Sequence, residues 1–210
     1  EIKSRCAPFL LICFIALKAV PSAAQSSVVR FQEGLAQCHA LLDAHDSKAA
    51  DYCAQLLNDP GYSLTPEQAV DVRFSLVDAL SFRGDYVEGL AVLLEIKTLT
   101  DDLVGDPAVE YRWYRKRGLL HYRLGEIVKA HDAYSKALRL AEISVDPVWL
   151  GQSFNDMAFL NKARGRYEAA LAAALQSLKY KRSVGQPLAI ALTLGNIADV
   201  HRALENSEQA

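Results

Sequence analysis

The sequence lacks the features that mark several common protein classes. No stretch alternates apolar and polar residues for long enough to predict a β-strand that is buried on one face. The net charge is only -2, with 23 lysines and arginines against 25 aspartates and glutamates, so no strong field attracts nucleic acid. The composition, 51% hydrophobic and 23% charged, has no bias towards disorder. We therefore expect one substantial folded body.

Catalytic and metal-binding signatures are also missing. The sequence contains no glycine-rich phosphate loop and no serine elbow. Its five histidines show no ligand spacing with cysteines or carboxylates. Asp101, Asp102 and Asp106 lack the glycine and the terminal glutamate of a calcium loop. We therefore expect no catalytic residue, no metal site and no cofactor in this chain.

The apolar run near the N-terminus is too short to cross a bilayer. It covers residues 7–17, eleven residues, whereas a membrane-spanning helix needs about 20. Lys3 and Arg5 precede the run, and small residues at 22–24 follow it, which is the order of a secretory signal peptide. The sequence therefore predicts a signal peptide at 1–24 and an exported protein at 25–210, in the periplasm or at the extracytoplasmic face of the membrane.

Cysteine is scarce, and two of the four cysteines lie within the predicted signal peptide. Cys38 and Cys53 remain, with 14 residues between them, nearly symmetric about a turn that we expect at His45 and Asp46. Two antiparallel helices would bring them face to face, and an oxidising compartment permits a disulfide. Two buried free thiols in separate packing layers are an equally good interpretation.

A pattern of glycine, tyrosine and alanine recurs every 40 or 41 residues. Its three best copies are Gly84-Asp85-Tyr86 with Gly89, Gly125-Glu126-Ile127 with Ala130, and Gly165-Arg166-Tyr167 with Ala170. Glu205 and Ala210 fall on the next interval. Self-similarity at this period is typical of a solenoid, whose units bury their apolar faces only by stacking. Because His121 and His201 occupy equivalent places in their repeats, we expect them to pack rather than to bind metal.

Each repeat is predicted to be a helix, a tight turn and a second helix. Prolines mark the joints between hairpins, where a proline can open a helix but not continue one. The expected helices cover about 28–43, 47–58, 66–83, 86–99, 108–124, 127–143, 148–164, 167–183 and 188–204. The sequence thus predicts an all-α, right-handed α-solenoid of about five antiparallel hairpins. The last hairpin would be truncated, since Ala210 would begin its second helix.

Small residues recur where the two helices of each hairpin are expected to cross. Gly118, Ala158 and Ala198 stand seven residues before the turn, and Ala130, Ala170 and Ala210 stand at the start of the following helix. Large side chains are expected to fill the spaces between hairpins, namely those of Tyr114, Tyr134 and Phe154.

With this pattern the sequence resembles the tetratricopeptide repeat (TPR) family over about residues 28–210. The period is longer than the usual 34 residues of that family. The residues that carry the resemblance are Tyr114, Gly118, Tyr122, Gly125, Ala130, Tyr134, Ala137, Leu138, Phe154, Ala158, Gly165, Tyr167, Ala170 and Leu178. The resemblance implies a superhelix that displays a concave face to a protein or peptide partner.

The layout of the family implies which side chains face the concave groove. These are Arg112, Arg115, Leu119, Tyr122, Arg123, Gln152, Asn155, Phe159, Lys162, Asn196, Asp199 and Arg202. Arginines grip carboxylates through charge-assisted hydrogen bonds, and asparagine side chains can pair with a peptide backbone. We therefore expect a groove for an acidic segment or a chain terminus. A solvated basic face that balances acidic neighbours is the alternative interpretation.

The sequence thus favours a non-catalytic, exported scaffold that binds a protein or peptide and no nucleic acid. An alternative is the extracytoplasmic sensor domain of a membrane-bound signalling enzyme, such as a diguanylate cyclase or histidine kinase with TPR repeats. The chain would then be an N-terminal fragment, and a later segment would anchor it to the membrane. A structural subunit of an envelope assembly complex is a third possibility, and it predicts a stable partner that co-purifies.

The substitution Ala170→Leu tests the predicted helix crossing. The larger side chain should overpack the crossing and lower the free energy of unfolding by about 1–3 kcal/mol. Urea unfolding followed by circular dichroism measures this change. An unchanged free energy of unfolding would place Ala170 outside the crossing.

Overall fold

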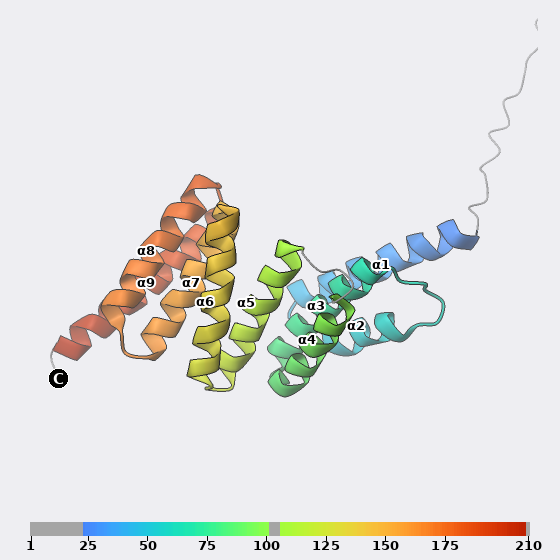
Figure 1. The fold of residues 1–210 in the computed structure, drawn as a ribbon, viewed down its shortest axis with the longest axis horizontal. Coiled ribbons are helices and arrows are strands. Elements are labelled where there is room, and N and C mark those ends of the chain that lie inside the picture. The colour runs from blue at the N-terminus through green and yellow to red at the C-terminus, as the bar shows by residue number, and fades with distance from the viewer. Residues whose placement is uncertain (1–22, 101–105, 209–210) are drawn as a thin grey trace, which may run out of the picture.

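The computed structural model describes residues 23–100 and 106–208, and all regular elements in these two ranges are α-helices. The predicted signal peptide lies outside the described residues except for Ala23 and Ala24, and Asp101, Asp102 and Ala210 also lie outside them. The helices, labelled in Figure 1, are α1 (Ala23–Asp43), α2 (Ala49–Asn58), α3 (Pro66–Arg83), α4 (Tyr86–Thr100), α5 (Pro107–Arg123), α6 (Ile127–Ser144), α7 (Pro147–Ala163), α8 (Tyr167–Ser183) and α9 (Pro187–Glu208). The predicted series of helices is confirmed, and most boundaries agree to within two residues.

Side-chain caps explain where three of these helices begin. Thr65 and Gln68 form a capping box at the start of α3. The backbone N–H of Gln68 donates to Thr65 Oγ1 over 3.3 Å, and the backbone N–H of Thr65 donates to Gln68 Oε1 over 3.0 Å. Asp106 and Asp146 accept hydrogen bonds from the first turns of α5 and α7. A proline follows each cap, at 66, 107 and 147.

Glycines in the left-handed backbone region end the first helix of three hairpins. The φ angles are 95° at Gly84, 74° at Gly125 and 68° at Gly165, a region that residues with a Cβ atom rarely adopt. The equivalent residue in α9 is Glu205, and here the helix continues to Glu208. Our prediction that this helix ends at 204 is therefore wrong, because the sequence lacks the glycine that would turn the chain.

The hairpins stack into an α-solenoid that extends along its long axis in Figure 1. Consecutive helices pack against one another throughout the described residues. The first helices of the hairpins, α1, α3, α5, α7 and α9, are called the A helices. Successive A helices also contact each other across repeats: α1 meets α3, α3 meets α5 and α5 meets α7. The A helices therefore line the inner, concave side of the stack.

The core is divided among the interfaces between hairpins. The largest of the clusters joins α1–α5 and includes Phe74, Leu80, Leu93 and Ile96, each at most 1% exposed. Between the next hairpins, Tyr111 stacks on Trp149 with ring centroids 4.4 Å apart. Tyr114 and Phe154 pack against this second cluster, and Tyr134 packs with Leu160 in another. The expected role of these three large side chains between hairpins is confirmed.

Small residues allow the helices of a hairpin to approach closely, as predicted. A Cβ atom at Gly118 would lie 2.5 Å from the ring of Tyr134, so only glycine fits. Ala130 and Ala170 are completely buried. Ala198 differs, because it is exposed on α9. Among the described residues no second helix covers this side of α9, where Leu188 and Leu192 are also exposed.

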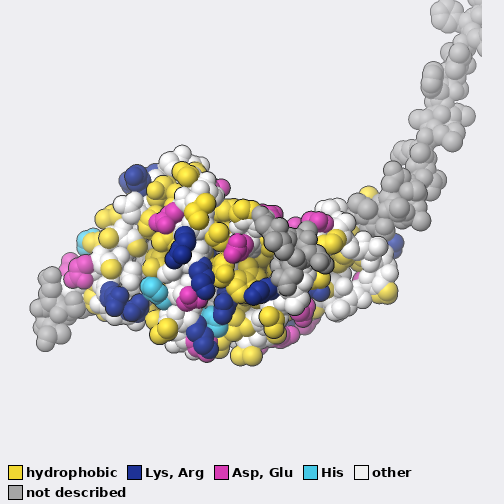
Figure 2. Space-filling model, viewed as in Figure 1, with side chains coloured by type: hydrophobic (Ala, Val, Ile, Leu, Met, Phe, Trp, Pro, Cys, Tyr) yellow, Lys and Arg dark blue, Asp and Glu magenta, His cyan; other side chains and the backbone are white. Residues whose placement is uncertain are grey.

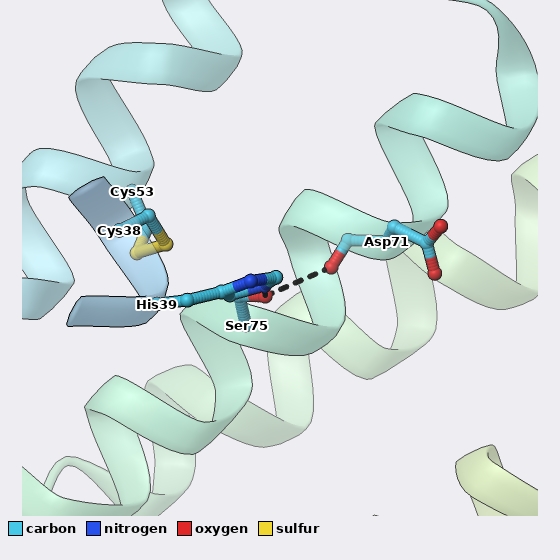
Figure 3. The surroundings of a disulfide bond; sticks show 5 residues. All are labelled: Cys38, His39, Cys53, Asp71 and Ser75. Atoms are coloured by element: carbon cyan, nitrogen blue, oxygen red, sulfur yellow. Dashed lines mark hydrogen bonds between the residues drawn. A yellow bond between two sulfur atoms is a disulfide. The ribbon is translucent and has the colours of Figure 1, made fainter. Parts of the chain in front are cut away.

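The first hairpin is joined by a disulfide between Cys38 of α1 and Cys53 of α2. The two Cα atoms are 5.5 Å apart, within the usual range for a disulfide. Both side chains are completely buried, and Figure 3 shows the bond beside His39. Of the two interpretations that the sequence leaves open, the structure has the disulfide.

Replacing both cysteines by alanine should destabilise the oxidised protein. A bridge that closes a loop of 15 residues contributes about 3 kcal/mol in the chain-entropy model. Denaturant unfolding of the wild type and of Cys38→Ala with Cys53→Ala measures the loss, and a reducing agent should remove most of the difference. Alkylation of both thiols in denatured, unreduced protein would contradict the disulfide.

Candidate functional site

The side chains predicted to form a groove lie on successive A helices, but many of them are engaged by neighbours. Arg112 of α5 donates from Nη1 to Asp71 Oδ1 of α3 over 2.7 Å. Its guanidinium lies 4.2 Å from the ring centroid of Phe74. Asp71 and Arg112 are 41 residues apart, one repeat. A carboxylate at the equivalent position of the preceding A helix thus neutralises this arginine.

Arg115 of α5 is also paired with an aspartate, in this case with one on the following A helix, α7. Its Nε and Nη2 atoms donate to the two carboxylate oxygens of Asp156 over 2.6 and 3.3 Å, and its Nη1 atom donates to Gln152 Oε1 over 2.7 Å. Burial acts to lower the pKa of Arg115, but the charge of Asp156 outweighs it and raises that pKa above its ordinary value. Arg115 therefore connects two A helices and is not free to grip a partner's carboxylate.

The predicted asparagines are engaged as well. Asn155 Oδ1 accepts from Lys181 Nζ over 3.3 Å and lies 3.5 Å from Asn196 Nδ2. Lys181 of α8 is only 8% exposed and also donates to Thr193 Oγ1 of α9 over 2.7 Å. Burial lowers the pKa of Lys181. This polar cluster joins α7, α8 and α9, and Lys181 is a buried charge that our sequence analysis missed.

Three of the remaining predicted residues, on α7 and α9, meet around a small gap. Phe159, Lys162 and Asn196 meet around a gap of about 10 Å³, room for roughly one water molecule. Lys162 Nζ lies 3.8 Å from Asp199 Oδ2, and Asp199 also pairs with Arg202.

Tyr122 and Arg123, at the end of α5, have different surroundings. Tyr122 is partly buried against the cluster of Tyr134 and Leu160. Arg123 is exposed, and no acidic side chain among the described residues pairs with it. The expected set of free arginines is therefore not assembled. The reason is that Asp71, Asp156 and neighbouring side chains occupy the guanidinium groups of Arg112 and Arg115.

The larger opening on the concave side lies nearer the N-terminus. We call it the N-terminal hollow. It has a volume of about 550 Å³ and is lined by residues of α1, the turn after it, α3 and α5. The lining side chains are His39, Leu42, Asp43, His45, Ser75, Asp78, Phe82 and Arg112. Only Arg112 belongs to the groove that the sequence predicted.

One wall of the N-terminal hollow is fixed by a hydrogen bond between A helices. Figure 3 shows His39 of α1 pointing to Ser75 of α3, with 3.1 Å between His39 Nε2 and Ser75 Oγ. The Ser75 hydroxyl donates to the backbone carbonyl of Asp71 over 3.2 Å. In the tautomer with the proton on Nε2, His39 donates to Ser75 Oγ, which joins α1 to α3. The contact positions the helices.

The opposite part of the hollow carries an exposed aromatic ring. Phe82 is 62% exposed, and the ring of His45 meets it edge to face at a centroid distance of 4.5 Å. His45 adopts a φ of 51°, which turns the chain between α1 and α2. Asp43 is exposed and, among the described residues, has no ion-pair partner. Asp78, by contrast, pairs with Lys116.

A second, smaller hollow lies between the first turns of α3 and α5. It has a volume of about 210 Å³, and Arg112 belongs to both hollows. Its other lining residues are Glu67, Val70, Asp71, Asp106, Ala108 and Val109. Three carboxylates therefore surround this opening.

Charge is distributed unequally along the chain. Residues 25–106 contain five lysines and arginines against 14 aspartates and glutamates, a net charge of -9, whereas residues 107–210 contain 15 against ten, a net charge of +5. Figure 2 shows lysines and arginines interleaved with acidic side chains over the middle of one face. Residues of α3, which belongs to the acidic stretch 25–106, line both hollows. The net charge of -2 for the whole sequence conceals this difference between the two parts of the chain. Counting the charged residues of each repeat separately would have revealed it.

Neither a metal site nor a membrane span is present among the described residues. They contain no group of three or more histidines, cysteines or carboxylates placed to hold a metal ion. Their helices are all too short or too polar to cross a bilayer. His121 is buried, lies 2.6 Å from Glu126 through Nδ1, and has an Nε2 atom without a hydrogen-bond partner. Its burial agrees with the expected packing role, whereas the equivalent His201 is exposed on α9.

The substitution Asp156→Ala tests the structural role of the Arg115 pair. It should lower the free energy of unfolding by about 1–3 kcal/mol, because a largely buried guanidinium loses its partner. The matched control is Asp71→Ala, which breaks the more exposed pair with Arg112 and should cost less than about 1 kcal/mol. Chemical denaturation of both variants measures the difference. Equal, small losses would mean that the pair of Arg115 and Asp156 stabilises the fold no more than the exposed pair does.

Comparisons with known proteins agree with this architecture. No family model matches the sequence, and no curated protein matches it. The structure is similar to the nearly identical TPR-like repeats of a putative kinesin light chain from Podosopora anserina, with a TM-score of 0.63 and 12% identity over 86% of this chain and 89% of that one. A variant of the same protein gives a TM-score of 0.64. BtubC from P. vanneervenii gives 0.58 and 16% identity over 88% of this chain and 67% of that one. The chain therefore has the fold of a TPR-like α-solenoid.

Proposed function

We propose that this chain is a non-catalytic scaffold that binds an extended segment of a partner protein on its concave face. The observation that carries the proposal is the N-terminal hollow of about 550 Å³. Three A helices and one turn contribute to it, so it lies on the face that a repeat array displays to partners. The similar structures of the putative kinesin light chain consist of TPR-like repeats.

The lining of the hollow is suited to an anchoring side chain of a partner. Leu42 and Phe82 offer apolar surface, and Asp43 and His45 at the rim offer polar groups. Interfaces of this kind obtain most of their affinity from a few residues that enter such openings. The A helices that hold the hollow are fixed to one another by the contacts of Arg112 and His39. The surface is thus largely preformed, which lowers the cost of binding.

The polar contacts in the hollow support binding rather than catalysis. Ser75 donates to a backbone carbonyl, Asp78 pairs with Lys116, and Arg112 pairs with Asp71. Each of these groups holds a helix in place, and the contact between the Ser75 hydroxyl and the His39 ring joins α3 to α1.

Export to an oxidising compartment is part of the proposal. The buried disulfide between Cys38 and Cys53 supports it, since disulfides persist mainly in secreted and periplasmic proteins. The order of charged, apolar and small residues at 1–24 supports it as well.

The experiment that tests the scaffold function is selection of random peptides on the immobilised, oxidised full chain. Selected peptides should bind the wild type, and Phe82→Ala should weaken their binding by about fivefold or more, the loss of one anchoring contact. Val128→Ala is the matched control, because this valine is 84% exposed on α6, a second helix of its hairpin.

Fluorescence anisotropy with labelled peptides gives the dissociation constants, and circular dichroism confirms that both variants are folded. Binding that falls equally in both variants, or only in Val128→Ala, would place the site elsewhere. A selection that yields no binding peptide would contradict the scaffold function.

A further inference from the structure

We propose that the partner segment is basic and places a lysine or arginine in the N-terminal hollow, between the Asp43 carboxylate and the Phe82 ring. This inference rests on the proposed scaffold function and names the chemistry of its partner. It reverses the expectation from the sequence, in which arginines of α5 would grip an acidic segment.

The basic groups near the hollow are already neutralised. Arg112 is paired with Asp71 over 2.7 Å, and Lys116 is paired with Asp78. A carboxylate of a partner would have to displace one of these aspartates. Asp43, in contrast, is exposed, and it has no ion-pair partner in the part of the chain that the structure describes. Among the described side chains that line the hollow, the carboxylate without an ion-pair partner is therefore that of Asp43, and the unpaired Arg123 of α5 does not line it.

An aromatic ring and an apolar side chain border the same hollow as the Asp43 carboxylate. The exposed ring of Phe82 borders the same hollow as Asp43. A cation gains from the face of an aromatic ring as well as from a carboxylate. Leu42 adds apolar surface for the methylene groups of a lysine or arginine stem. One ammonium or guanidinium group can thus satisfy the polar and the aromatic side of the opening together.

Most of the side chains that line the two hollows belong to the acidic part of the solenoid. Glu67, Asp71 and Asp106 line the smaller opening on the other side of Arg112. Residues 25–106 carry a net charge of -9, and residues 107–210 carry +5. Such a field attracts a basic segment to the N-terminal hairpins and repels it from the C-terminal ones. The field therefore sets where along the concave face the segment binds.

The test compares three peptides of equal length on the oxidised full chain: one rich in lysine, one with glutamate at the same positions, and one with glutamine. We expect the lysine peptide to bind best and its affinity to fall with added salt. Asp43→Asn should weaken it about fivefold, the effect of one exposed charge pair. Glu142→Gln is the control, because it removes the same charge from the exposed end of α6, away from both hollows.

Each outcome decides the proposal. Selective loss in Asp43→Asn supports it. Equal losses in both variants would show attraction by the general field, and the assignment to the hollow would fail. Stronger binding of the glutamate peptide, lost in Phe82→Ala, would overturn the basic partner but leave the scaffold function intact. If none of the three designed peptides binds while the selected peptides still bind through Phe82, the basic partner would also be overturned and the scaffold function would stand. Failure of the selection as well would overturn both.

Discussion

Each hairpin of this solenoid can bury its apolar face only against its neighbours, and the rest of the structure depends on that constraint. It requires a small residue where helices cross, which is why Gly118 leaves no room for a Cβ atom beneath Tyr134. In the hairpin α1–α2 a covalent bond adds to this packing. The disulfide between Cys38 and Cys53 joins its two helices and stabilises the fold by restricting the unfolded chain.

The same stacking decides the electrostatics of the concave face. Because the repeat is 40 or 41 residues long, a side chain on one A helix faces its equivalent on the next. Asp71 meets Arg112 in this way, and Asp156 meets Arg115, each pair 41 residues apart. Opposite charges at equivalent positions therefore join the A helices and neutralise Arg112 and Arg115. Among the described residues, this compensation is incomplete at Asp43 and at Arg123, which have no ion-pair partner.

The fold could be predicted from the sequence because its signals are local. Prolines, capping residues and left-handed glycines mark where helices begin and end, and the failure at Glu205 came where such a glycine is absent. The site could not be predicted in the same way. Whether Arg115 is free depends on what stands opposite it on α7, a question of helix rotation that the family layout did not answer. The 41-residue spacing to Asp156 was the one available signal.

Side-chain size at equivalent positions explains why the hollow lies at the N-terminal end. Ser75 of α3 is one repeat before Lys116 of α5, and Phe82 is one repeat before Arg123. Where α5 meets α7, the long side chains of Arg115 and Gln152 fill the space between the A helices. Where α1 meets α3, the shorter side chain of Ser75 contacts His39 beside the hollow. The backbone of the hairpin recurs in every repeat, whereas the opening occurs where particular side chains line it. The binding properties of a repeat array therefore depend on a few lining residues and not on the fold.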